Sequence, residues 1–169
     1  MNMTKLQETP IQNVHFGYNS SMSHNNNQII MEQYPMERSQ IVKLLQQHDI
    51  TPTRQRIEIA GYLFQRPQHL SAENILEGVN AEGNRVSRAT VYNTMGLFTD
   101  RGLVREVLID RERVFYDTNR SNHYHVYDVD SGELHDVLHS EIQIASVPEL
   151  PEGARIVDTN VILRVSSKA

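Results

Sequence analysis

The fold is decided by the stretch SRATVYNTMGLFTDRGLVREVLIDRERVFYD, residues 87–117. Ser87 is a typical helix N-cap, and the positions after it keep a helical period as far as Asp100. Two β-rich runs follow, at residues 103–109 and 113–117, joined by a short polar turn. A helix followed by a hairpin is typical of a winged helix-turn-helix domain, which lays one helix against DNA.

The helix expected at residues 87–100 has two different faces. One is apolar and predicted to be buried: Val91, Thr94, Met95 and Phe98. The other carries a cation, a phenol, an amide and two very small residues: Arg88, Ala89, Tyr92, Asn93 and Gly96. A solvated face usually carries several Lys and Glu, whereas small residues let a backbone approach a groove closely. The second face therefore favours DNA contact over an ordinary solvated surface.

Three further helices are expected upstream, at residues 37–48, 51–64 and 71–79, each with an apolar stripe. Thr51 is the expected N-cap of the second, with Pro52 at its first position. The third is expected to begin at an N-cap serine with an acid in its first turn.

Downstream, His123 and His125 are two positions apart, so on a strand both imidazoles leave the same face, roughly 6.6 Å apart at the backbone. At this spacing both imidazole nitrogens can bind the same metal ion. Strands are expected at residues 123–129, 133–138 and 155–165. The piece is too small to bury a core alone, so we expect it to complete its core against a second copy.

These elements predict an α+β chain in three parts. Residues 1–36 are rich in Asn, Gln and Ser without a sustained period, and are expected to form a disordered N-terminal extension. Residues 37–118 would form the winged-helix DNA-binding domain. Residues 119–169 would form a small α/β domain for dimerisation and metal sensing.

Composition narrows the classes of function. The net charge of -5 is uneven: residues 37–113 carry eleven basic and ten acidic groups, and residues 114–169 carry four and nine. The middle segment can present a basic face, and the acidic end suits a cation. Cysteine is absent, which excludes a disulfide, a thiolate zinc site and a cysteine nucleophile. No apolar run approaches the length of a membrane span, so we expect a cytoplasmic protein.

The sequence resembles the ferric uptake regulator family over residues 38–165. Four motifs carry the resemblance: Pro52-Thr53-Arg54-Gln55-Arg56, His69-Leu70-Ser71-Ala72-Glu73, Ala89-Thr90-Val91-Tyr92-Asn93 and His123-Tyr124-His125. Three further features look closest to the iron response regulator branch: the lack of cysteine, Phe115-Tyr116-Asp117-Thr118-Asn119 and Pro148-Glu149-Leu150-Pro151-Glu152-Gly153.

The resemblance implies one regulatory divalent metal per subunit. The positions that match the family's ligands are His69, Asp117, His123, His125 and Asp136. Nitrogen and carboxylate donors suit Fe²⁺ or Mn²⁺ and would also take Zn²⁺. The iron response regulator branch also brings in haem, with the histidines near residue 123 as axial ligands.

The chain departs from the family at the structural zinc. The first cysteine pair of many relatives corresponds here to Asp128 and Ser131, so no cysteine-ligated zinc is expected. The dimerisation helix expected after Leu138 would be short and interrupted by Pro148.

The implied partner is double-stranded DNA, bound by a homodimer at an inverted repeat rich in A·T pairs. The candidate DNA contacts are Arg54, Arg56, Arg88, Thr90, Tyr92 and Asn93. For Arg54 and Arg56 the alternative is an ion pair with Glu58 or Glu73.

The function indicated is a metal-responsive transcriptional regulator of metal homeostasis or oxidative-stress genes. Two alternatives remain: a metal-independent winged-helix repressor, and a non-haem metal enzyme built on the His-x-His pair. The sequence leaves the signal open among iron, manganese, haem and peroxide oxidation of a metal-bound histidine.

Overall fold

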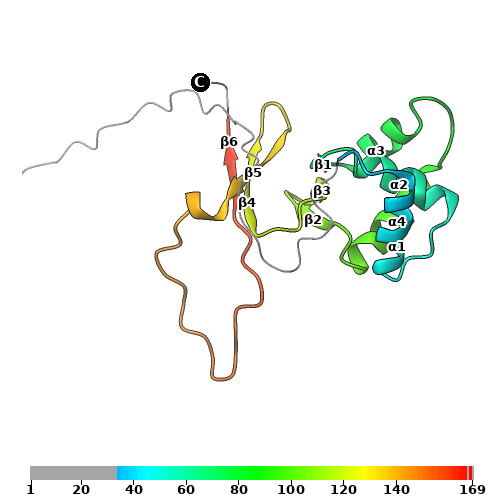
Figure 1. The fold of residues 1–169 in the computed structure, drawn as a ribbon. Helices are drawn as coiled ribbons and strands as arrows, with labels where there is room; N and C mark the ends of the chain where they lie inside the picture. The colour runs from blue at the N-terminus through cyan, green and yellow to red at the C-terminus, as the bar shows by residue number, and fades with distance from the viewer. Residues whose placement is uncertain (1–33, 167, 169) are drawn as a thin grey trace, which may run out of the picture. The chain divides into compact units, whose positions relative to one another are not determined.

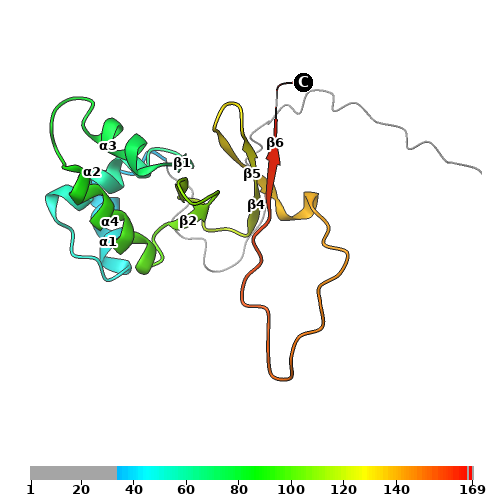
Figure 2. The same ribbon diagram turned by 180° about the vertical axis from the view of Figure 1, so that it is seen from behind.

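The computed structural model describes residues 34–166 and 168. The predicted extension therefore lies almost wholly outside the described residues. In these residues four α-helices, with one two-residue strand between the second and the third, precede the remaining strands, and the strands form two small sheets (Figures 1 and 2). This order confirms the predicted α+β fold class. Within the described part of the chain, no helix has the length and apolar character needed to cross a membrane.

The helices are α1 (Arg38–Gln47), α2 (Arg54–Leu63), α3 (Ala72–Val79) and α4 (Arg88–Asp100). They share one core, in which Leu45, Leu63, Ile75 and Phe98 are fully enclosed. The apolar face predicted for α4 is confirmed, because all four of its residues are buried. On the opposite face, Arg88, Ala89, Tyr92 and Asn93 are exposed and Gly96 is half-buried.

The helix caps correct one prediction. Ser71 and Ser87 accept hydrogen bonds from backbone N–H groups in the first turns of α3 and α4, as expected. The cap of α2 is Thr53, whose hydroxyl accepts from the N–H of Arg56, so the assignment to Thr51 was wrong. Thr51 and Thr53 are both residues that can cap a helix. The cap is Thr53, the one nearer to the apolar residues of α2.

The first sheet contains β1 (His69–Leu70), β2 (Arg105–Leu108) and β3 (Val114–Asp117) in the order β1-β3-β2. Strands β2 and β3 form the predicted hairpin. The short strand β1 was not predicted, and it pairs antiparallel with β3 so that His69 lies opposite Asp117. This pairing ties the segment before α3 to the end of the hairpin.

The second sheet contains β4 (His123–Asp128), β5 (Leu134–Leu138) and β6 (Ile162–Val165) in the order β5-β4-β6. Strand β5 is antiparallel to β4, with Asp136 opposite His125. Strand β6 is parallel to β4. The prediction of a strand starting at Arg155 was wrong, since only Ile162 onward pairs.

Residues 142–161 make a long excursion from the second sheet (Figure 1). Pro148, Pro151 and the left-handed Gly153 oppose regular structure there. The expected helix after Leu138 is reduced to a single 3₁₀ turn, η1 (His139–Glu141).

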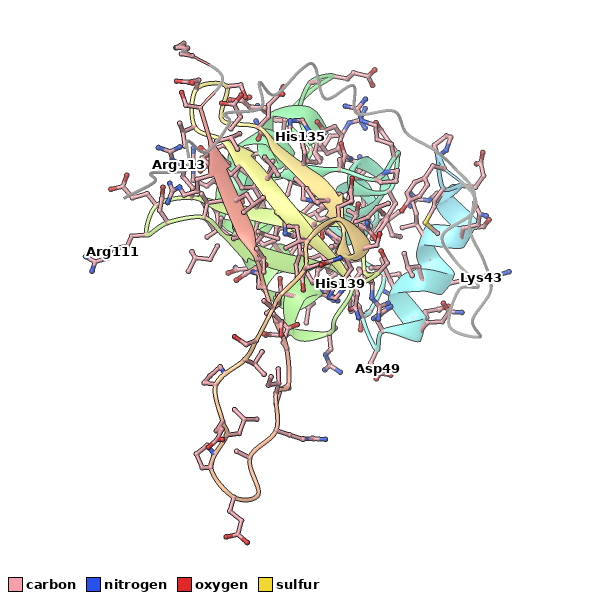
Figure 3. The ribbon with its side chains drawn as sticks, turned by 90° about the vertical axis from the view of Figure 1, so that its left-hand side faces the viewer. Lys43, Asp49, Arg111, Arg113, His135 and His139 are labelled. Atoms are coloured by element: carbon pink, nitrogen blue, oxygen red, sulfur yellow. The ribbon has the colours of Figure 1, made fainter. Side chains whose placement is uncertain are left out.

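The second sheet obtains part of its core from the wing hairpin. Val107 and Ile109 of the hairpin pack with Tyr127 and Leu134 of the second sheet. Arg113 also donates a hydrogen bond to the Tyr127 hydroxyl. By contrast, Arg111 at the hairpin tip extends away from the ribbon (Figure 3).

Candidate metal centre

Two strand registers and one short connection bring the candidate ligands together. The β1–β3 register places His69 opposite Asp117, and the β4–β5 register places His125 opposite Asp136. Residues 118–122 join β3 to β4, so His123 follows Asp117 after one tight connection. Segments far apart in the sequence therefore meet at one point.

The functional atoms converge closely. Ligand atoms of His69, Asp117, His123 and His125 all lie within 4.8 Å of one another. The His123 Nε2 atom lies 3.0 Å from Asp117 Oδ2 and 3.1 Å from His125 Nε2. Asp136 joins through its Oδ1 atom, which lies 2.8 Å from His69 Nε2 and 3.3 Å from His123 Nε2. All five predicted ligand residues are brought to one cluster.

The cluster is buried and its hydrogen bonding is incomplete. The Asp117 side chain is fully enclosed, and those of His123 and His125 nearly so. The His69 Nε2, Asp117 Oδ2 and Asp136 Oδ1 atoms are buried without a hydrogen-bond partner, although they lie close to one another. Buried polar atoms are nearly always satisfied, so converging unsatisfied lone pairs fit a cation at their centre.

Neighbouring polar groups orient the cluster. The Nδ1 atom of His123 lies 2.9 Å from the Ser121 carbonyl oxygen, so its N–H donates there and Nε2 turns toward the carboxylates. Asn119 binds both acids: its backbone N–H donates to Asp117 Oδ1 at 2.6 Å and its side-chain amide donates to Asp136 Oδ2 at 2.7 Å. Hydrogen bonds of this kind to the candidate ligands hold them in one orientation.

Neighbouring charges shift the pKa values of Asp117 and His123. Burial opposes ionisation of Asp117, but the close imidazoles of His123 and His125 outweigh it and hold the Asp117 pKa well below its usual range. Burial likewise opposes protonation of His123, but the close carboxylate of Asp117 and the charge of Asp136 outweigh it, so the His123 pKa is raised. Three imidazoles facing two ionised carboxylates form a donor set for Fe²⁺, Mn²⁺ or Zn²⁺.

Two other histidines, His135 of β5 and His139 of η1, lie outside this cluster (both are labelled in Figure 3). His139 Nε2 lies 2.8 Å from the Tyr124 hydroxyl, and the two rings stack. His135 lies 3.4 Å from a carboxylate oxygen of Glu133. Neither contributes to the group of candidate ligands found in the described residues.

The predicted DNA-contact residues lie on α2 and α4. Arg88, Tyr92 and Asn93 are exposed on α4, and Thr90 is half-buried near its N-terminus. Arg88 and Tyr92 both bind the carboxylate of Glu73 on α3.

The two candidate arginines of α2 do not make the ion pairs considered above. Arg54 is exposed, and Arg56 donates to the Thr51 carbonyl oxygen at 2.9 Å. Glu58 pairs instead with Arg85, and Glu73 with Arg88.

Residues 47–164 match the model of the ferric uptake regulator family. The chain belongs to this family. It is therefore a metal-responsive transcriptional regulator and not an enzyme, which removes the non-haem enzyme alternative.

The chain is also similar in sequence or fold to individual regulators. The peroxide-responsive repressor PerR of Staphylococcus aureus is 29% identical over 112 residues, covering 66% of this chain and 76% of its own length. The ferric uptake regulator from Pseudomonas aeruginosa, solved with manganese, is 26% identical and covers 76% of this chain and 98% of its own, with a TM-score of 0.59. The Helicobacter pylori regulator, at 15% identity, 80% and 95% coverage and a TM-score of 0.60, supports the fold alone.

Sequence reasoning missed two residues that organise these sites. Asn119 enters the sequence analysis only as part of a motif, although an Asp side chain commonly accepts from the backbone N–H two residues on, as Asp117 does here. Glu73 is predicted from the sequence only as an acid in the first turn of α3, because its contacts with α4 depend on packing between helices that the sequence pattern does not specify.

Proposed function

We propose that His69, Asp117, His123, His125 and Asp136 hold one divalent metal ion, and that its binding sets the DNA-binding activity of residues 37–118. The observation that supports this most is the origin of the ligands. His69 and Asp117 belong to the first sheet, whereas His123, His125 and Asp136 belong to the second. An ion bound to all five would fasten the two sheets at their connection.

Neighbouring residues orient the candidate ligands and connect one of them to helix α3. Asn119 holds both carboxylates, and Ser121 orients His123 through its carbonyl group. His69 lies two residues before the N-cap of α3, so its position is tied to the start of that helix. A bound cation would neutralise the carboxylates and draw His69 toward the second sheet.

Fe²⁺ and Mn²⁺ are the proposed ions, with Zn²⁺ as a competitor, because the donors are nitrogen and oxygen alone. The manganese-containing Pseudomonas aeruginosa structure supports this choice. The similarity to a peroxide-responsive repressor supports oxidative stress as one signal. Assignment to the haem-linked iron response regulator branch rests on the absence of cysteine and the motifs quoted above, and we keep it as the alternative.

We further propose that residues 119–169 form the dimerisation and metal-sensing domain of a cytoplasmic homodimer, which binds an A·T-rich inverted repeat. Exposed Arg88, Tyr92 and Asn93 on α4 support a groove-facing helix. Arg54, Arg56 and Thr90 are the proposed flanking contacts. Exposed Leu163 and Val165 on the edge strand β6 support association through the second sheet.

The test is metal and DNA binding by a ligand variant. His123→Ala should lower affinity for Mn²⁺ at least tenfold, because one of a small set of ligands is lost, and should abolish the metal response in a gel-shift assay. Mn²⁺ titration by calorimetry measures the first effect. The control is His135→Ala, which removes a neighbouring strand histidine outside the cluster. A variant His123→Ala that binds Mn²⁺ and responds to it normally would show that the regulatory ion is not held by His123 and its neighbours.

A further inference from the structure

The DNA-facing side of α4 contains a hydrogen-bonded group whose acceptor comes from another helix. Glu73 lies in the first turn of α3. Its Oε1 atom accepts from Arg88 Nη1 at 2.8 Å and from the Tyr92 hydroxyl at 2.7 Å. One carboxylate oxygen therefore holds two of the side chains proposed to contact DNA.

This group contributes little to folding. The side chains of Arg88 and Glu73 are 62% and 50% exposed, and Tyr92 as a whole is 46% exposed. Exposed ion pairs of this kind add little to the stability of a protein, because water screens them and holding two long side chains in place costs entropy. The group is nonetheless ordered into one arrangement at the surface where DNA is expected.

The direction of the hydrogen bond restricts what Tyr92 can recognise. A phenol has one O–H donor and can also accept. Since the donor is directed at Glu73, the outward side of the oxygen can only accept. In the major groove, adenine and cytosine present amino donors, whereas guanine and thymine present acceptors at the corresponding positions.

We propose that Glu73 is a specificity-determining positioning residue, which commits the Tyr92 hydroxyl to accepting a hydrogen bond and so selects an adenine or cytosine amino group at the contacted base. Arg88 keeps N–H groups beyond the one that Glu73 engages, and these can reach guanine or phosphate. This inference rests on the proposed function, since it assumes that α4 enters a major groove.

The Tyr92 pKa, measured in the protein without DNA, tests the hydrogen bond between Tyr92 and Glu73. The hydrogen bond to Glu73 raises the pKa of the Tyr92 phenol, and that same bond lowers the pKa of Glu73. In Glu73→Ala the Tyr92 pKa should fall, as followed by NMR of tyrosine labelled at Cζ, with Tyr92→Phe to assign the signal. An unchanged pKa would overturn the hydrogen bond on which the proposal depends.

The decisive experiment selects DNA from a random-sequence duplex pool with the full-length, Mn²⁺-loaded protein. Tyr92→Phe identifies the base position that the hydroxyl reads, because preference is lost there. At that position the wild type should favour adenine or cytosine on the contacted strand by about fivefold or more, and Glu73→Ala should reduce this to about twofold or less. Preferences at other positions should persist.

Two variants separate positioning from charge. Glu77→Ala removes an exposed acid one turn further along α3, so it should raise affinity for shuffled DNA as Glu73→Ala does, without changing base preference. Glu73→Gln keeps an acceptor oxygen and should keep part of the preference. If the wild type selects no sequence, the proposed function fails. If it selects one and Glu73→Ala selects the same base at the Tyr92 position, only this inference fails.

Discussion

Two polar clusters of this chain differ most in their exposure to water. The cluster around Asp117 and His123 is enclosed, and it joins residues of both sheets. The cluster of Glu73, Arg88 and Tyr92 is about half exposed, and it joins two neighbouring helices. Both contain opposite charges at hydrogen-bond distance, but burial makes the first cluster the larger determinant of stability, whereas exposure makes the second contribute little to folding.

The largest expected effect comes from breaking the buried cluster. Asp117→Ala should destabilise the metal-free protein by about 3–5 kcal/mol at pH 6, because the buried histidines lose their counter-charge. Urea unfolding followed by circular dichroism measures this. Asp136→Ala is the matched control: its side chain is 34% exposed, so its loss should cost clearly less. Equal losses would show that enclosure does not distinguish the two acids.

Structural features that depend on residues close in sequence, such as helix faces and caps, were predicted well. Features that depend on pairing between distant segments were not. The buried face of α4 and the caps of α3 and α4 follow from local patterns, and both were predicted correctly. The two-residue strand β1 exists only because β3 pairs with it, so no periodicity could reveal it. The extent of β6 was overestimated for a similar reason, since only Ile162–Val165 find a partner in β4.

The candidate ligands show the same limit. The spacing of His123 and His125 indicates a shared face without further information. His69 and Asp117 lie far apart in the sequence, and only the family resemblance suggested them before the β1–β3 register placed them opposite each other. The role of Asn119 required the three-dimensional positions of both carboxylates.

The exposed cluster should show the reverse pattern of effects. Tyr92→Ala should weaken binding to the selected DNA duplex by about 1–3 kcal/mol, a typical cost for one base-reading contact. The same variant should change the free energy of unfolding by less than about 1 kcal/mol, because the side chain is largely exposed. Fluorescence anisotropy and urea unfolding measure the two quantities. A stability loss as large as that of Asp117→Ala would remove the contrast between the clusters.

The smallest expected effect is the pH dependence of the buried cluster, which should have opposite signs with and without metal. The His123 pKa is raised above its ordinary value by Asp117 and Asp136, against the opposing effect of burial. Its protonated form therefore stabilises the metal-free fold below the unfolded-state pKa, about 6.5, and this contribution is lost as pH rises through the raised folded-state value. The low Asp117 pKa means that this carboxylate stays ionised throughout that window.

Metal binding reverses the sign, because a histidine ligand must be neutral to offer its lone pair. Raising the pH from about 6 to 8 should slightly lower the midpoint of thermal unfolding of the chelated protein and should raise its affinity for Mn²⁺. In His123→Ala both slopes should be reduced, whereas His135→Ala should leave both unchanged. Parallel slopes in the chelated and Mn²⁺-loaded protein would mean that the buried histidines do not face the ion, and that the closeness of their nitrogens to Asp117 serves the fold alone.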